Sequence, residues 1–212
     1  MGQKVNPVGF RRGVYTSWDS RWFARGNKSY AQSFLEDLQI RNLVAKNLSS
    51  AEVSRIEIEK TEASMRVVIH SARPGQVIGK KGQDIEALRG LLAKALNKKM
   101  VEVSVQEIRK PELDARLIAK DIAEQMERRG SYKRAMKKAA ADAMRSGARG
   151  VAIRVAGRLA GAEIARDEKV SVGSLPRHTL RSNIEYGTAV AQTTYGSTGV
   201  KVWVCHGDFK VS

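Results

Sequence analysis

Cysteine and long apolar runs are the first things this chain lacks. Cys205 is the single cysteine among 212 residues, which excludes an internal disulfide and a zinc site built from several cysteines and fits a reducing compartment. No apolar run reaches the roughly 18 residues that a membrane-spanning helix needs. The opening residues also lack the apolar segment of a secretory signal. We therefore expect a cytoplasmic protein with no membrane partner.

Negative charge is also scarce. The chain has 22 Asp and Glu against 38 Lys and Arg, which leaves a formal net charge of +16, and the excess is positive in every part of the chain. Such a charge weakens a compact state by self-repulsion unless an anionic partner screens it, and nucleic acid is the commonest such partner. The hydrophobic share of 42% is still sufficient for a folded core.

Residues 1–28 are predicted to form a basic arm in which glycines and cations alternate with aromatic residues. Disordered tails are poor in aromatics, so docking on a partner or on the body of the protein is favoured over a flexible terminus. Arginine beside rings that can stack is also typical of RNA contacts. The candidate RNA contacts of the arm are Lys4, Arg11 and Arg12.

Residues 29–109 carry the pattern of a helix, two strands, two helices separated by a turn, and a third strand. The first helix is indicated by apolar residues at helical spacing, namely Phe34, Leu35, Leu38, Leu43, Val44 and Leu48. The strands are indicated by alternation of apolar and polar residues, with Ile56, Ile58, Val67, Ile69, Val101, Val103 and Val105 as the apolar set.

The turn Gly79-Lys80-Lys81-Gly82 between the two later helices is the sharpest local motif. Glycine lets a nucleic-acid backbone approach closely, while adjacent lysines and helix N-terminal amides favour phosphate. With the strands in this order, the turn indicates a type II KH domain, αββααβ. A nucleotide P-loop is disfavoured, because only three residues separate Gly75 from Gly79 and no Lys-Ser or Lys-Thr pair follows.

Pro111 marks the expected domain boundary, so residues 110–212 form a second domain. This domain is predicted to contain two helices and a four-stranded, mostly antiparallel sheet, which gives an α+β fold with two domains overall. The predicted helices cover 112–129 and 131–147, and the predicted strands lie near 150–157, 163–173, 180–191 and 198–206.

The densest run of positive charge lies between Arg128 and Arg149. It comprises Arg128, Arg129, Lys133, Arg134, Lys137, Lys138, Arg145 and Arg149, with Asp142 as the lone acidic residue. On a helix of about 100° per residue, five of these cations share about 120° of arc opposite an apolar face, namely Arg134, Lys137, Lys138, Arg145 and Arg149. A solvated helix face usually interleaves Glu with Lys, so nucleic-acid contact is the favoured interpretation of this basic ridge.

The sequence shows no arrangement of residues typical of an enzyme active site. His70, His178 and His206 stand at no spacing typical of metal ligands or of a catalytic triad. Cys205 and His206 are neighbours on a predicted strand and so point to opposite faces. We therefore predict no catalytic residue, no metal and no cofactor.

Several segments resemble, in order and spacing, the bacterial type of the small-subunit ribosomal protein three family. They are MGQKVNPVGFRRG, ARPGQVIGKKG, IRKPELDARLIA, YKRAMKKA, GRLAGAEIAR, TTYG and GVKVW, and they extend over nearly the whole chain. The resemblance implies a structural RNA-binding protein of the small-subunit head. Its implied partners are 16S-type ribosomal RNA and the neighbouring head proteins numbered ten and fourteen in bacterial nomenclature.

The resemblance further implies that the basic ridge contacts messenger RNA where it enters the subunit and helps to open messenger duplexes. That role falls on Lys133, Arg134 and Lys137, where Lys133 replaces the arginine of some relatives and loses its planar fork. The rival class is a free KH-type regulator of single-stranded RNA, and a DNA-repair lyase with a lysine nucleophile is considered only as a side activity, for which no lysine is marked by its sequence surroundings. A single Gly-X-X-Gly turn and the dispersed charge favour the ribosomal interpretation.

Overall fold

The computed structural model describes residues 4–48, 51–61, 64–96 and 100–209, and the chain divides into two compact units. Trp18–Arg109 form the central unit, whereas Met1–Ser17 and Lys110–Ser212 together form the C-terminal unit. The expected arm of residues 1–28 is thus shared between the two units. None of the described helices is long and apolar enough to cross a membrane.

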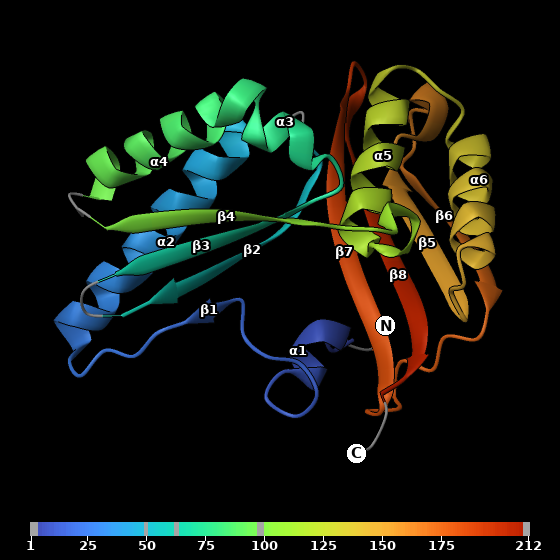
Figure 1. Cartoon of the computed structure of the whole chain (residues 1–212). Helices are drawn as coiled ribbons and strands as arrows, with labels where there is room; N and C mark the ends of the chain where they lie inside the picture. Colours follow the sequence, from blue (N-terminus) through green and yellow to red (C-terminus); the bar gives the residue numbers. More distant parts are fainter. Residues whose placement is uncertain (1–3, 49–50, 62–63, 97–99, 210–212) are drawn as a thin grey trace. The chain divides into compact units, whose positions relative to one another are not determined.

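The central unit has a four-stranded mixed sheet covered by helices (Figure 1). Its strands are β1 (Ser20–Arg21), β2 (Val53–Lys60), β3 (Met65–Ser71) and β4 (Val101–Glu107), in the spatial order β1-β2-β3-β4. Its helices are α2 (Asn27–Asn47), α3 (Pro74–Ile78) and α4 (Gln83–Leu96). β2 and β3 are antiparallel, and β4 lies parallel to β3. The predicted order αββααβ is confirmed from α2 to β4.

The core of the central unit lies between the sheet and helices α2 and α4. Ile40 and Val44 of α2 meet Leu92 of α4 and Ile58 of β2 there, all fully buried. Half of the apolar residues that were expected to pack the first helix lie at the surface instead: Phe34, Leu35 and Leu38 are 48%, 58% and 42% exposed.

A buried ion pair explains why the first half of α2 does not pack through its apolar residues. Lys60, at the end of β2, reaches Asp37 at 2.5 Å and Glu36 at 3.2 Å, and Trp22 donates its indole N–H to Asp37 at 2.9 Å. Asp37 and Lys60 are both nearly buried. The face of α2 that turns inward here is therefore polar, and the apolar residues on the other side remain exposed.

The C-terminal unit has a four-stranded antiparallel sheet with two long helices on one face (Figure 1). The helices are α5 (Ala115–Glu127) and α6 (Tyr132–Arg145), and a short α1 (Pro7–Arg11) precedes them in the chain. The strands are β5 (Gly150–Gly157), β6 (Arg166–Gly173), β7 (Ser182–Thr193) and β8 (Gly196–Asp208), in the spatial order β6-β5-β8-β7. The predicted α+β class with an antiparallel C-terminal sheet is confirmed.

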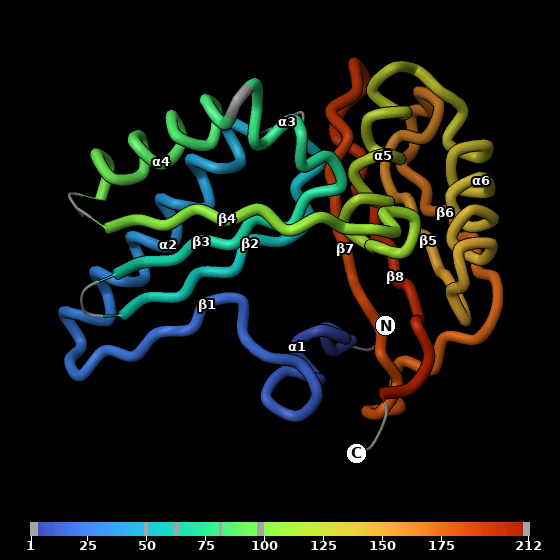
Figure 2. The backbone as a smooth tube through the Cα atoms, viewed as in Figure 1, coloured from blue at the N-terminus to red at the C-terminus, as the bar shows by residue number. Residues whose placement is uncertain are grey.

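The core of the C-terminal unit joins α5 and α6 to one face of this sheet. Ile122 of α5 and Met136 of α6 pack against Ile153 of β5 and Val202 of β8, each at most 1% exposed. α5 begins three residues later than predicted, because the Asp114 carboxylate accepts hydrogen bonds from the first backbone amides of the helix and so sets its start. The N-terminal segment with α1 lies beside β7 (Figure 2).

Candidate nucleic-acid interface

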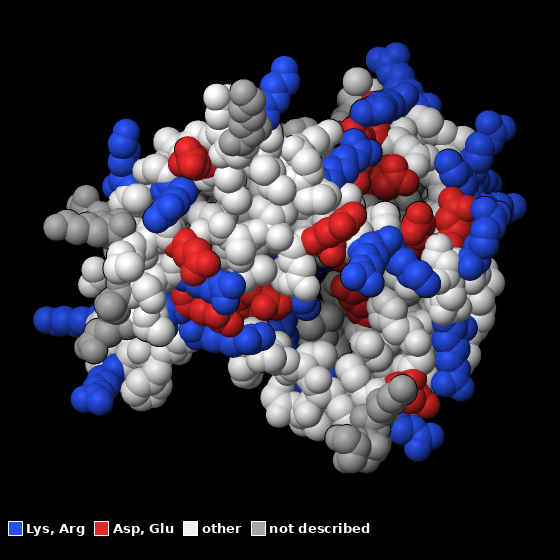
Figure 3. Space-filling view, viewed as in Figure 1, with Lys and Arg blue, Asp and Glu red and all other residues white. Residues whose placement is uncertain are grey.

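Helix α6 buries one side and presents cations on the other. Tyr132, Met136, Ala140 and Ala143 face the core, at 8%, 1%, 1% and 0% exposure. The cations on the opposite side are all exposed and are Arg134, Lys137, Lys138 and Arg145. At about 100° per residue these four lie within about 100° of arc. The space-filling view shows Lys and Arg gathered over α6 (Figure 3).

The ion pairs of this stretch divide its eight cations into two groups. Arg128 contacts Glu124 and Arg145 contacts Asp142, while Arg149 contacts Asp208 at 3.4 Å. Lys133 contacts Glu168 at 3.7 Å. The other four of the eight, Arg129, Arg134, Lys137 and Lys138, have no ion pair within the described residues. Three of these four lie together on the exposed side of α6, so the middle of the helix holds uncompensated positive charge.

Three of the predicted ridge residues lie off the helix. α6 ends at Arg145, because Gly147 adopts a φ of +109° that a helix does not accept. Arg149 therefore stands beside β8, where its backbone amide donates to the Cys205 carbonyl at 2.8 Å. Arg128 and Arg129 lie in the turn between α5 and α6, where Arg129 has a φ of +61°. The expectation that Arg149 shares the helical face is wrong.

Lys133 is anchored to the neighbouring strand. Its ammonium lies 3.7 Å from the Glu168 carboxylate of β6, and Tyr132 donates its hydroxyl to the same carboxylate at 2.8 Å. This hydrogen bond raises the pKa of the Tyr132 phenol, which keeps it protonated as a donor. Glu168 therefore offsets part of the charge of Lys133, in contrast to the unpaired Arg134.

The predicted KH turn connects α3 to α4 through a short 3-10 turn at Lys80–Gly82. Gly79 and Gly82 have φ values of +71° and +80°, which L-residues rarely adopt. A Cβ on Gly79 would also collide with the Asp84 carboxylate, so both its positive φ and the lack of space favour glycine at position 79. Lys80 is exposed, whereas the side chain of Lys81 lies outside the described residues.

Acidic residues stand close to this turn. Asp84 and Glu86 occupy the first turn of α4, where carboxylates stabilise the positive end of the helix dipole. An approaching phosphate would meet Asp84 beside Gly79. The case for phosphate binding is therefore weaker at the KH turn than on α6, because the Asp84 carboxylate occupies the space beside Gly79.

Arg11 of the predicted arm is a structural residue, which corrects its prediction as an RNA contact. It is 1% exposed, and its guanidinium donates to the carbonyls of Pro7, Thr179 and Ser182 at 2.8, 2.7 and 2.5 Å. The five donors of a guanidinium suit such a cluster of carbonyls. Burial lowers the pKa of Arg11 from its ordinary value. Arg11 thus joins α1 to the segment that leads into β7.

The other two predicted arm contacts remain at the surface to different degrees. Lys4 is exposed. Arg12 is half-buried and donates to the Ser17 carbonyl at 2.5 Å, which closes the loop after α1.

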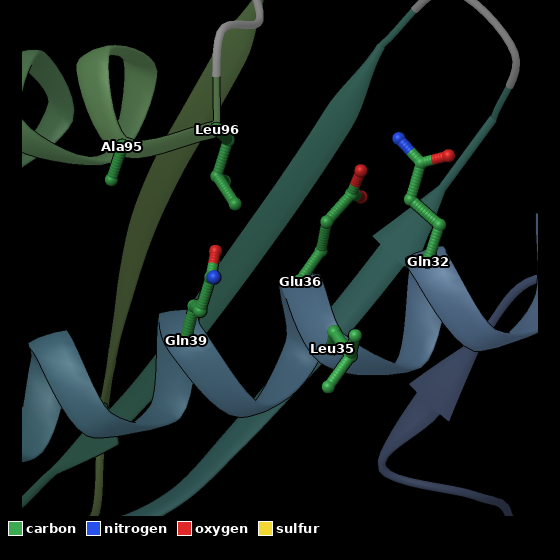
Figure 4. Close-up of a pocket in the computed structure, with 6 residues that line it drawn as sticks. All are labelled: Gln32, Leu35, Glu36, Gln39, Ala95 and Leu96. Carbon is green, nitrogen blue, oxygen red and sulfur yellow. The ribbon is translucent and has the colours of Figure 1, made fainter.

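A shallow pocket between α2 and α4 offers no catalytic constellation. Its lining combines apolar groups, amides and one carboxylate from Gln32, Leu35, Glu36, Gln39, Ala95 and Leu96 (Figure 4). The carboxylate belongs to Glu36, which pairs with Lys60. Across the described part of the chain, no group of three or more His, Cys, Asp or Glu residues is placed to hold a metal ion.

The structure also brings together cations that the sequence analysis did not single out. Arg154 of β5 is the register partner of Lys169 on β6 and of Lys201 on β8. All three side chains are exposed. They are far apart in the sequence, and only the register of three strands makes them neighbours. Alternation within each strand could indicate which face each cation occupies, but not that the three lie side by side.

Comparison with known proteins gives both units a family. A model of the KH domain matches residues 39–113, and a model described as ribosomal protein S3, C-terminal domain, matches residues 122–204. These matches fall on the units that carry the Gly-X-X-Gly turn and the basic ridge.

Full-length relatives extend this likeness over nearly the whole chain. A relative from Rhodospirillum centenum, named small ribosomal subunit protein uS3, is 56% identical over 208 residues, which cover 98% of this chain and 91% of the relative. Proteins of the same name from Gluconobacter oxydans and Coxiella burnetii are 54% and 52% identical over the same shares of each chain. These relatives carry the name of a ribosomal protein and not of an enzyme. The chain belongs to the uS3 family of small ribosomal subunit proteins.

Proposed function

We propose that this protein is an RNA-binding component of the small ribosomal subunit head, where it contacts 16S-type ribosomal RNA. Its family, its KH domain and its net charge of +16 support this role. We further propose that its protein neighbours are the head proteins numbered ten and fourteen. Sedimentation of tagged protein through a sucrose gradient tests the assignment: migration with small subunits is expected, whereas a pool confined to light fractions would favour a free RNA-binding regulator.

We also propose that the basic ridge, centred on α6, grips messenger RNA as it enters the subunit and helps to open messenger duplexes. The observation that carries this proposal is the group of cations without ion pairs, Arg134, Lys137 and Lys138, on the exposed side of a helix whose other side holds the core. Such cations need not break a protein contact before they meet a phosphate. A surface that keeps a hairpin from re-annealing has to hold one of its strands whatever the sequence, and contacts to phosphates do this.

Translation of two messages by reconstituted subunits tests the messenger role. Subunits with Arg134→Ala and Lys137→Ala should assemble and translate an unstructured message nearly normally, but slow on a message with a stable hairpin downstream of the decoding site. A matched variant, Lys46→Ala with Lys94→Ala, removes two exposed cations from the central unit and should show no selective slowing. Equal slowing on both messages would refute the duplex-opening role. Failure of the ridge variant to enter subunits would assign the ridge to ribosomal RNA.

A further inference from the structure

The sheet of the C-terminal unit has a second face, opposite α5 and α6, and this face carries a row of cations. Along β8 the side chains alternate: Val200, Val202 and Val204 are buried against the helices, so Lys201 lies on the other face. The strand register places Arg154 directly beside Lys201, and Lys169 directly beside Arg154. Three exposed cations thus stand side by side across β6, β5 and β8.

The central sheet provides an internal comparison. Its exposed face carries Glu59 of β2, Arg66 of β3 and Glu102 of β4 in the same kind of cross-strand row. The signs alternate there, and Arg66 pairs with Glu102 at 3.8 Å. Opposite charges in directly opposed positions stabilise a sheet, and like charges destabilise it. The row of like charges on the C-terminal sheet therefore costs stability that the central sheet avoids.

The row is poorly compensated by carboxylates. Asp167 pairs with Arg154 at 2.9 Å. Lys169 and Lys201 have no ion pair within the described residues. An anion placed along the row would relieve the repulsion between these cations, so the row is electrostatically complementary to a chain of phosphates.

The adjacent aromatic residues favour backbone contact over base stacking. Trp203 and Tyr186 occupy the next positions on this face of β8 and β7, with ring centroids 5.3 Å apart. The guanidinium of Arg177 lies 4.2 Å from the centroid of the Trp203 ring and already covers it. Because Arg177 covers the Trp203 ring, the cations of this face are more available to phosphates than the Trp203 ring is to a base.

We infer that Lys169, Arg154 and Lys201 form a second RNA contact surface, which binds the sugar-phosphate backbone without reading sequence. This inference rests on the proposed role of the protein in binding RNA, but it concerns a surface separate from the ridge on α6. The two surfaces lie on opposite sides of one layered unit, since α6 covers one face of the sheet and the row lies on the other.

Salt dependence of RNA binding by the full chain provides the test. The variant Lys169→Gln with Lys201→Gln removes the two unpaired cations and keeps Arg154, so that Asp167 retains its partner. With each lost phosphate contact worth about 0.7 in the log-log slope for single strands, the slope should fall by about 1.4. The loss should be equal for RNAs of different sequence. The melting temperature should stay the same or rise, because like-charge repulsion is removed.

A control variant with the same change of net charge shows whether the fall in the salt slope comes from a local RNA contact or from the lower charge of the whole protein. The control variant, Lys46→Gln with Lys94→Gln, removes two exposed cations from α2 and α4. An unchanged slope in the sheet variant, or an equal fall in both variants, would overturn the inference. So would normal RNA binding combined with poor incorporation into subunits, which would assign the face to a protein neighbour. If the ridge variant loses affinity and the sheet variant does not, the inference fails but the proposed function is still supported. A slope near zero for the wild-type protein would contradict both the inference and the proposed function.

Discussion

Neutralising the unpaired cations of α6 provides the most direct test of how the ridge works. The variant carries Arg134→Gln, Lys137→Gln and Lys138→Gln. These side chains are exposed and have no ion pair within the described residues, so the change removes charge without leaving a carboxylate uncompensated. Because the packed side of α6 is untouched, the free energy of unfolding should change by less than about 0.5 kcal/mol.

The expected loss can be worked out from counterion release. Three lost phosphate contacts, each worth about 0.7, lower the log-log slope of RNA affinity against salt by about 2. Between about 50 and 200 mM salt, a slope change of this size alters the ratio of the two affinities by roughly 18-fold. Fluorescence anisotropy with a single-stranded RNA, over a series of salt concentrations, measures both the slope and the affinity.

A matched control guards against a trivial effect of net charge. The control variant, with Lys46→Gln, Arg89→Gln and Lys94→Gln, also loses three exposed cations, all on helices of the central unit. Its slope should stay near that of the wild type. If both variants lose the same slope, the ridge is part of a diffuse field and not a site. If neither does, α6 does not touch RNA.

Three further predictions concern positions where the structure assigns a role to single residues. Arg11→Met should lower the free energy of unfolding by more than about 2 kcal/mol, because buried carbonyls lose their donor, while RNA affinity per folded molecule should persist; denaturant titration beside RNA binding checks this. Gly79→Ala should cost about 1–3 kcal/mol through its positive φ, and adding Asp84→Gly, which also removes the Asp84 Cβ at 2.7 Å, should relieve the clash but not the φ strain, as thermal melting can show. The pKa of Asp208 is lowered, chiefly by the hydrogen bond from Ser182 and then by Arg149 and Arg181, so its contribution is present at neutral pH and is lost as the pH falls through the folded pKa. The melting temperature of Asp208→Asn should therefore lie below that of the wild type at neutral pH and converge with it in acid; a gap that persists at low pH would contradict this assignment.

Local periodicity predicted the buried and cationic sides of α6 but could not predict where the helix ends. The alternation of Met136 with Arg134 and Lys137 is a property of one helix and needs no knowledge of the rest of the fold. The end of the helix depends on Gly147, whose positive φ removes Arg149 from the helical face. Glycine inside a helical pattern is a weak signal, since it is tolerated at a cost, and the basic pattern continues beyond it.

Long-range contacts account for the other failures of sequence reasoning. Arg11 is one of two adjacent arginines, and nothing local distinguishes it from Arg12; its carbonyl partner on Ser182 is 171 residues away. Phe34 and Leu38 fit a helical period, but the period does not say which side of α2 faces the sheet. That choice is made by Asp37, which turns inward to meet Lys60.

In the proposed RNA contact, the distribution of ion pairs sets which cations of the ridge attract phosphate most strongly. Lys133 and Arg145, on the first and last turns of α6, each have a carboxylate within 4 Å, whereas Arg134, Lys137 and Lys138 between them have none within the described residues. Exposed pairs are worth at most about 1 kcal/mol, so phosphate can replace these carboxylates once RNA is in contact, but the pairs reduce the field before contact. The unpaired cations should therefore engage the strand first, with the paired ones joining at some cost. Under the proposed messenger role, the ridge would bind a strand most tightly at the middle of α6 and more weakly at the two ends of the helix, which suits a strand that has to move past.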